Sequence, residues 1–474
     1  MTDVDPNGEN ERITNTSRRS YLGVLAGAAS VPVFGSVAAA DDGTVLTVTG
    51  RGSTAHYEFS VTGDVEKSTA QGATIKSFDE IDGAHVSGRT TREADSFAFT
   101  GEITGFEADA PVDVTIDGQP AQLSDGADTA SAQADSDDDG DSEVDESEYS
   151  EVVDIVEAGA DNDGDSSIMS TLERVADDGT LVKFPAGEYL VDGTVRIAGY
   201  EQFGMVGDDA TIRVAPTDDY TFKLGTYRSP IDDLHVEGFT ADISGDNTGG
   251  RVFELQAGDD LYAGDLTVSG KHDTPSKGPM LVGMQSSDGE GLVENVDLSD
   301  GGEDVSGGRG GTGLLVSNYH EGTVTLRDIQ IGPFPDNGIY CSQGDSSADG
   351  TVHVEGGRVE NANVAGVRLG GDGSSIEGTE FVYDEDIDGF GGQRPIRLDG
   401  GSGLEVSEVS IEMSIDQTEA IRVMPGVDSA SIHDVDMDLS GTVRDGVSVT
   451  GGAGSVETDD LSVSGNGRYD VFEY

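Results

Sequence analysis

Three arginines occupy equivalent positions of a four-residue phrase that repeats along the last third of the chain. Each arginine stands between two apolar residues, and the three are Arg368, Arg397 and Arg422. Guanidinium groups bind carboxylates and similar anions through paired hydrogen bonds. Two interpretations are open: the arginines hold anionic groups of a polysaccharide, or acidic side chains on neighbouring rows neutralise them.

Two residues near these arginines could transfer protons. Tyr340 has the position of the arginines one repeat earlier, and His320 follows Val316, the end of the preceding repeat, by four residues. Removing the C5 proton of a uronate sugar needs a base and a cation that neutralises the carboxylate. The hypothesis is a lyase or epimerase in which Tyr340 and His320 are catalytic and the arginines bind substrate.

Further polar residues precede the same phrases. Arg394 lies three residues before Arg397, and Asn337, Asn361 and Asn363 lie in the turns before two of the repeats. Asparagine in such corners often adopts a left-handed backbone or stacks in a ladder within the turn. The alternative is recognition of sugar hydroxyls, so we add these four residues to the predicted substrate-binding set.

Acidic residues of the sequence could also serve hydrolysis or metal binding. An inverting glycosidase needs two carboxyl groups about 6.5–9.5 Å apart, and several pairs are available among Asp384, Glu385, Asp386 and Asp388. The segment 161–165 is similar to the start of a Ca²⁺ loop but lacks its glycine and distal glutamate. No cysteine and histidine cluster indicates zinc. We predict no metal site and no certain cofactor, and Ca²⁺ remains an option.

The phrases that carry these residues begin at 313, 338, 366, 395, 420 and 446, so the repeat is 25 to 29 residues long. Alternation of apolar and variable residues predicts a strand whose middle residue points outward. A second phrase recurs in step at 326–331, 406–411 and 432–437. A propeller repeats at about 40–50 residues. We therefore predict an all-β chain whose residues 150–474 form a right-handed parallel β-helix.

Neighbouring turns of such a helix lie about 4.8 Å apart. The three arginines would then stand in line over roughly 10 Å. The single cysteine, Cys341, has an inward position of the repeat and is expected to be a small core residue.

The chain before residue 150 contains three other segments. Residues 1–40 have the twin arginine Arg18-Arg19, an apolar run and small residues at 38–40, which predict a Tat export signal cleaved near Ala40 and a secreted protein. No second apolar run is long enough to span a membrane. Residues 41–122 alternate cleanly and predict a small antiparallel β-sandwich or barrel. Residues 123–149 are an acidic stretch expected to be a disordered linker.

Charge excludes some partners. The chain has 93 acidic and 26 basic residues, a net charge of −67. Such a surface repels nucleic acid and anionic lipid. Because the acidic residues are spread along the whole chain, they indicate adaptation to concentrated salt. The sequence predicts no oligomeric state.

Residues 159–191 resemble the opening segment of the pectate-lyase-like superfamily. They combine Gly159-Ala160 and Asp163-Gly164, a helical pattern at 168–175, and a strand phrase from Gly179 to Val191. The resemblance implies a right-handed parallel β-helix whose open end a helix covers. Its members include pectate and pectin lyases, polygalacturonases, alginate epimerases and phage tailspikes, and many act on acidic polysaccharides.

Two shorter resemblances add to this. Residues 57–68 are similar to an N-terminal module of secreted haloarchaeal proteins, and residues 336–340 and 361–369 resemble a haloarchaeal β-helix family. The predicted partner is an acidic polysaccharide that the protein binds and cleaves or epimerises. The alternatives are a non-catalytic surface or adhesion protein that uses the same face, and an inverting glycoside hydrolase.

Overall fold

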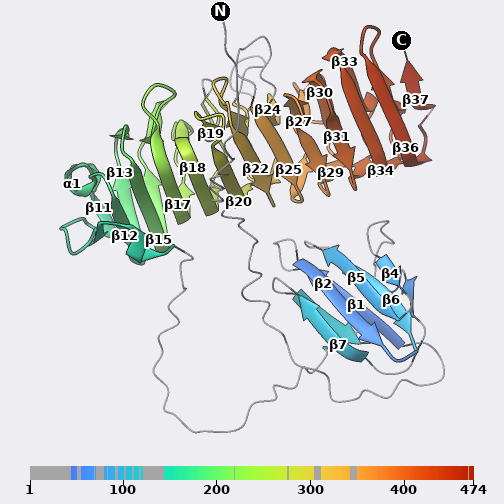
Figure 1. The fold of residues 1–474 in the computed structure, drawn as a ribbon, viewed down its shortest axis with the longest axis horizontal. Helices are drawn as coiled ribbons and strands as arrows, with labels where there is room; N and C mark the ends of the chain where they lie inside the picture. The colour runs from blue at the N-terminus through green and yellow to red at the C-terminus, as the bar shows by residue number, and fades with distance from the viewer. Residues whose placement is uncertain are drawn as a thin grey trace, which may run out of the picture.

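The computed structural model (Figure 1) describes most of residues 41–122 and nearly all of residues 150–474. The described residues are 44–50, 55–63, 65–68, 70, 80–82, 84–90, 94–100, 103–108, 112–116, 119–120, 144–217, 219–274, 277–303, 311–341, 350–467 and 469–473. The predicted export signal and most of the predicted linker lie outside them. Residues 144–149, which we placed in the linker, include a short 3-10 turn, η2 (Glu146–Glu148), capped by Asp145.

The N-terminal residues form two antiparallel sheets that share one core. One sheet has the order β3-β6-β1-β8-β9 and the other β4-β5-β2-β7. Phe59 of the second sheet meets Phe97 of the first edge-to-face, with ring centroids 5.3 Å apart. Phe97 and Phe99 are fully buried, so these aromatic rings belong to the core of the two sheets. The strands are β1 (Thr44–Gly50), β2 (Ala55–Val61), β3 (Val65–Ser68), β4 (Glu80–Asp82), β5 (His85–Thr90), β6 (Ala94–Phe99), β7 (Ile103–Ala108), β8 (Val112–Ile116) and β9 (Gln119–Pro120).

Residues 151–473 form a parallel β-helix of about 11 turns, which confirms the predicted fold class. Three rows of strands run along it (Figure 1), and each strand pairs in parallel with the equivalent strand of the next turn. Row 1 carries the phrases with the arginines. Its strands are β14 (Val195–Ile197), β16 (Tyr220–Leu224), the start of β18 (Arg251–Ser269), β19 (Met280–Met284), β21 (Leu314–Val316), β24 (Asn337–Cys341), β27 (Ala365–Gly370), β30 (Ile396–Gly401), β33 (Gln417–Val427), β35 (Val443–Val449) and β37 (Tyr469–Glu473).

Rows 2 and 3 complete each turn, and several strands pass through both. Row 2 contains β10 (Glu151–Asp154), β12 (Thr180–Phe184), β22 (Thr323–Arg327), β25 (Thr351–Glu355), β28 (Ser375–Glu377) and β31 (Leu404–Ser407). Row 3 contains β11 (Asp163–Ser167), β13 (Gly187–Val191), β23 (Gln330–Ile331), β26 (Arg358–Glu360), β29 (Glu380–Tyr383) and β32 (Ser410–Met413). The strands shared by both rows are β15 (Gln202–Val214), β17 (Ile231–Asp242), β18, β20 (Glu290–Leu298), β34 (Ser429–Leu439) and β36 (Ser455–Gly465).

The core is a stack of inward apolar residues in register from turn to turn. In row 1 the stack includes Ile339, Val367, Ile396, Ile421 and Val447, all fully buried. Burying each of these side chains contributes roughly 1.5–3 kcal/mol. The repeat therefore holds the turns together through the residues that flank the variable position.

A left-handed residue turns the chain between rows 2 and 3 in each of ten successive turns. The φ angles lie between 42° and 78°. A Cβ is unfavourable in this backbone region, and glycine, asparagine and aspartate tolerate it best. The ten residues are Asp209, Gly238, Asp265, Asn295, Asp328, Gly356, Gly378, Glu408, Asp434 and Asp460. The second repeating phrase is two short strands joined by this corner at 326–331 and at 406–411, whereas at 432–437 it is one strand that bends at Asp434.

A short helix stands beside the first turns of the β-helix. Helix α1 (Met169–Val175) buries Leu172, and the preceding Ile168 is also buried in the same core. The helix lies at one end of the β-helix in Figure 1, where it covers side chains that the open end would expose. Among the residues that the structure describes, no helix has the length and apolar character needed to cross a membrane.

The left-handed residues between rows 2 and 3 lead to a prediction about stability. Asn295→Val is expected to lower the free energy of unfolding by about 1–2 kcal/mol, because a β-branched side chain cannot adopt φ near 52° without strain. Asn295→Gly is expected to change it by no more than about 0.5 kcal/mol. Urea unfolding in concentrated salt measures both, and Glu290→Val on the exposed strand nearby is the control. An equal loss for Asn295→Val and Glu290→Val would contradict the role of the corner.

Candidate functional site

The predicted residues Tyr340, Arg368, Arg397 and Arg422 stand in one column on the outward face of row 1. Tyr340 pairs in register with Arg368, Arg368 with Arg397, and Arg397 with Arg422. At about 4.8 Å for each turn, the three arginines span roughly 10 Å. Ser448 follows them in the next turn. The β-helix register therefore brings together residues that are 28, 29 and 25 positions apart.

Asp399 is paired with two of these arginines at once. Arg368 Nε and Nη2 both lie 2.5 Å from Asp399 Oδ2, and Arg397 Nε donates to Oδ1 at 2.5 Å. Asp399 is two residues after Arg397 on β30, so it occupies the next outward position of the same strand. One carboxylate thus separates two stacked guanidinium groups that would otherwise repel each other.

Glu419 has the same role for another pair. Arg394 Nε donates to Glu419 Oε1 at 3.0 Å, and Arg422 Nη2 lies 2.8 Å from the same oxygen. The Glu419 side chain is fully buried, and its Oε2 has no hydrogen-bond partner among the described residues. Burial lowers the pKa of Arg394, and Glu419 opposes that shift. An arginine nevertheless stays charged in proteins.

These six residues, Arg368, Arg394, Arg397, Arg422, Asp399 and Glu419, are called the arginine cluster below. Four guanidinium groups face two carboxylates, which leaves a formal charge of +2. The arginine side chains are 13–29% exposed, whereas the carboxylates are 0% and 12% exposed. The positive groups are therefore nearer to solvent than the groups that neutralise them.

Tyr340 lies against the cluster. The Cζ atom of Arg368 is 4.5 Å from the centroid of the Tyr340 ring, a cation–π contact. Tyr340 is half-buried, so part of it faces solvent beside the guanidinium group. A phenol and a carboxylate-binding cation are neighbours here.

His320 is separate from this surface. It is fully buried, its Nδ1 accepts the backbone N–H of Met284 at 3.1 Å, and its Nε2 lies 3.0 Å from the carbonyl oxygen of Thr351. Burial lowers the pKa of His320, which favours the neutral ring. The residue ties adjacent turns together, and both of its nitrogens are occupied in doing so.

The three asparagines are also in the interior. Asn361 has a φ of 50°, and its side chain binds the Asp384 carboxylate at 2.9 Å and the backbone N–H groups of Asp384 and Glu385. Asn363 donates to the carbonyl oxygen of Pro335 at 2.8 Å and accepts from Gly392 N–H. These contacts fit the structural interpretation of both residues. Asn337 is fully buried, and its side chain has no hydrogen-bond partner among the described residues.

Asp399 and Glu419 were not predicted from the sequence as partners of the arginines. Their signals were present: Asp399 is two residues after Arg397, and Glu419 has the repeat position of Arg394, 25 residues later. Both look ordinary in a chain with 93 acidic residues. Only the register shows that each is placed between two arginines.

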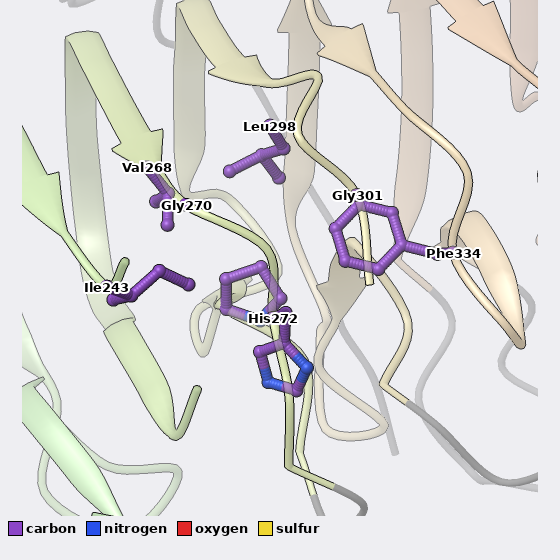
Figure 2. Close-up of a pocket in the computed structure, with 8 residues that line it drawn as sticks. Ile243, Val268, Gly270, His272, Leu298, Gly301 and Phe334 are labelled. Atoms are coloured by element: carbon purple, nitrogen blue, oxygen red, sulfur yellow. The ribbon is translucent and has the colours of Figure 1, made fainter. Parts of the chain in front are cut away.

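A small apolar pocket lies elsewhere, at the ends of row 3 strands (Figure 2). Its lining includes Val268, Leu298, Phe334 and the ring of His272. Burial lowers the pKa of His272 to about 4, so this ring is neutral at pH 7. No carboxylate or arginine lines the pocket, which makes it unsuited to a charged ligand.

No group of three or more histidine, cysteine, aspartate or glutamate residues in the described ranges is placed to hold a metal ion. In the segment 161–165, Asp161 Oδ1 accepts the backbone N–H groups of Asp163 and Asp165 at 3.1 Å each. This carboxylate therefore stabilises a turn.

The fold and the column define this chain as a parallel β-helix protein with a cationic outward face, the architecture that the resemblance of residues 159–191 implied. No family model and no curated protein matches the chain. Among solved structures it is similar to the A-module of the Azotobacter vinelandii mannuronan C-5 epimerase AlgE4, with 12% identity, 68% of this chain and 97% of that chain covered, and a TM-score of 0.48.

Two other solved structures show a similar degree of likeness. The Streptococcus pneumoniae surface protein and adhesin PfbA has 13% identity over 68% of this chain and 100% of that chain, with a TM-score of 0.47. The Yersinia enterocolitica family 28 exopolygalacturonase has 9% identity over 92% of this chain and 98% of that chain, with a TM-score of 0.38. At these values no activity and no site residue passes to the present chain, and its fold rests on its own strand register.

The shared carboxylate makes a prediction about stability. Asp399→Asn is expected to lower the free energy of unfolding by about 1–3 kcal/mol, since it removes charged hydrogen bonds and leaves Arg368 beside Arg397. Urea unfolding at low and high KCl measures the loss, which should shrink as salt screens the repulsion. Glu360→Gln is the matched control, because Arg358 keeps its second partner, Glu380. A loss no greater than that of the control would contradict the role of Asp399.

Proposed function

We propose that this protein binds an anionic polysaccharide along row 1, with the arginine cluster holding its carboxylate or sulfate groups. The observation that carries the proposal is the charge balance of the cluster: four arginines in contact with two carboxylates, with the arginines nearer to solvent. A polymer lying along the β-helix axis would meet one guanidinium group at each turn. Each group has a planar fork that matches a carboxylate or sulfate.

The rest of the chain supports this location. With a net charge of −67, the protein repels anions over most of its surface. A polyanion is therefore expected to bind only where cations outnumber carboxylates locally. The predicted export signal fits an extracellular ligand of this class.

The first test replaces the three arginines of the outward column of row 1. Arg368→Gln, Arg397→Gln and Arg422→Gln together are expected to weaken binding of an anionic glycan by about 100-fold or more, because each charged hydrogen bond contributes roughly 1.5–3 kcal/mol. Isothermal titration calorimetry with polygalacturonate, alginate and a sulfated galactan measures the loss, with dextran as the neutral polymer.

The matched control is Arg327→Gln in row 2. Arg327 is also paired with two carboxylates, Glu294 and Glu355, but it lies in another row. It should leave binding unchanged. If the triple variant keeps its fold by circular dichroism and binds as tightly as the unmodified protein, the arginine cluster is not the binding site.

A second candidate function is elimination or epimerisation of a uronate. The observation that favours it is the contact between Tyr340 and Arg368. Both reactions begin with loss of the C5 proton, and the charge that then develops on the carboxylate would be stabilised by Arg368. In elimination the Tyr340 phenolate takes the C5 proton, and the phenol so formed protonates O4 as the C4–O bond breaks. In epimerisation the Tyr340 phenolate takes the C5 proton, water donates a proton to the opposite face of C5, and the Tyr340 phenol returns its proton to solvent. Tyr340 is the proton-transfer residue in this proposal, and His320, with both nitrogens occupied, has no part in it.

The test of this candidate is Tyr340→Phe. The variant should lose formation of unsaturated uronates, or exchange of the C5 proton with deuterium in an NMR assay, while its affinity in calorimetry stays the same. Activity that survives in Tyr340→Phe would overturn the assignment. If the unmodified protein shows neither reaction, with or without Ca²⁺, the non-catalytic adhesion alternative is favoured. Release of reducing ends without unsaturation would favour the inverting hydrolase.

A further inference from the structure

A second group of cations lies on row 1, several turns before the arginine cluster. It surrounds the ring of Tyr220, whose centroid is 4.1 Å from Lys223 Nζ, 4.7 Å from Lys277 Nζ and 5.5 Å from Arg196 Cζ. Lys223 and Arg196 are in register in adjacent strands and belong to the same outward column as Arg368. Three cations around one tyrosine are unexpected in a chain that has only 26 lysines and arginines.

A fourth cation, Arg251, completes the group. It pairs in register with Tyr220 in the next turn and lies three residues before Glu254 on the same strand. Arg251 is only 6% exposed, and its Nε and Nη1 have no hydrogen-bond partner among the described residues. A buried guanidinium group with unused donors is costly. An anion would supply the missing acceptors.

The acidic residues here do not balance the cations. Lys223 is paired with Glu254, which also accepts from Gln256 Nε2 at 3.2 Å. Lys277 Nζ lies 3.5 Å from Asp219. Among the residues that the structure describes, two carboxylates are paired with members of this group of four cations, which leaves a formal charge of +2, as in the arginine cluster. The two groups together use eight of the 26 basic residues of the chain.

We propose that Arg196, Lys223, Arg251 and Lys277, gathered around Tyr220, form a second site for a carboxylate or sulfate group, and that one polysaccharide chain occupies both sites. The first half of this statement stands by itself, and the second half rests on the proposed function of the arginine cluster. The residues are called the Tyr220 cluster below.

The distance between the sites sets the length of the ligand. Five turns separate β16 from β27 through β18, β19, β21 and β24, which corresponds to about 24 Å. Figure 1 shows β19 and β24 between β18 and β27 along the axis of the β-helix. The outward residues on the way are Glu254, Leu281, Leu315 and Tyr340. This middle stretch is mainly apolar, so it suits the faces of sugar rings and not their charged groups.

Two linked sites make affinity depend on chain length. Once one cluster holds the polymer, the second contact becomes intramolecular and adds affinity without any new residue. A ligand too short to span about 24 Å cannot gain this. The protein is therefore expected to bind decagalacturonate at least 10-fold more tightly than trigalacturonate, and the same holds for sulfated galactan oligomers if sulfate is the preferred group.

The experiment is calorimetry with oligomers of both lengths and both chemistries at fixed ionic strength. The variant Lys223→Gln with Lys277→Gln should reduce decamer affinity to the trimer value. The Arg368→Gln, Arg397→Gln and Arg422→Gln variant should do the same and should still bind trimer at the Tyr220 cluster. All five changes together should abolish binding. Arg251→Gln is a further single variant, and Lys183→Gln, a surface lysine paired with Glu146, is the control.

The outcomes separate the two proposals. If the lysine changes leave both oligomer lengths unaffected while the arginine changes abolish binding, the Tyr220 cluster is not a site and the proposed function stands. If the reverse holds, the Tyr220 cluster binds alone and the proposed role of the arginine cluster fails. If the unmodified protein binds trimer and decamer with equal affinity, one polysaccharide chain does not occupy both clusters. If none of the four oligomers binds, the Tyr220 cluster is not an anion site.

Discussion

The left-handed corner between rows 2 and 3 is the constraint on which the structure depends. A parallel β-helix keeps its register only if every turn changes direction at the same place, because a shift of one residue moves every side chain to the other face. The chain meets this condition with a residue of positive φ at the corner in each of ten turns, and at one corner Gly357 follows Gly356 with a positive φ as well. Nine of the ten corner residues are glycine, asparagine or aspartate. The acidic composition and this requirement coincide, since aspartate tolerates the left-handed region and also supplies charge. Glu408 is the exception.

The cationic face follows from that register. Core residues such as Ile396 fix the inward positions, so the residue between them is free to vary without cost to the core. Stacking like charges at a turn spacing of about 4.8 Å is unfavourable in itself. The protein offsets it by placing one carboxylate between two arginines, with Asp399 next to the column and Glu419 beneath its edge. The result is a stable surface that is still positive.

The sequence predicts the architecture well because both of its signals are local and repeated. The alternation around Tyr340, Arg368 and Arg397 shows which residues point outward, and the constant period shows that they align. The partners could not be found in this way, because Asp399 and Glu419 are recognised only by their place relative to a neighbouring turn. The inward position of His320 could not be predicted for a related reason: its spacing from Val316 puts it near the face, but its ring contacts the backbone of Met284 and Thr351. Arg251 was not predicted as a site residue, because the sequence does not show that its guanidinium group lacks hydrogen-bond acceptors.

The short ion pairs of the cationic face have a consequence for the environment in which the protein could work. Proteins that bind polyanions usually lose affinity as salt rises. Here the net negative charge of the whole protein repels an anionic ligand at long range. Salt screens this long-range repulsion most strongly, because the Debye length falls to about 3 Å at 1 M. The contacts within the clusters are partly buried and are screened less. Added salt should therefore ease the approach of the proposed polyanion to this protein before it weakens the ion pairs within the clusters.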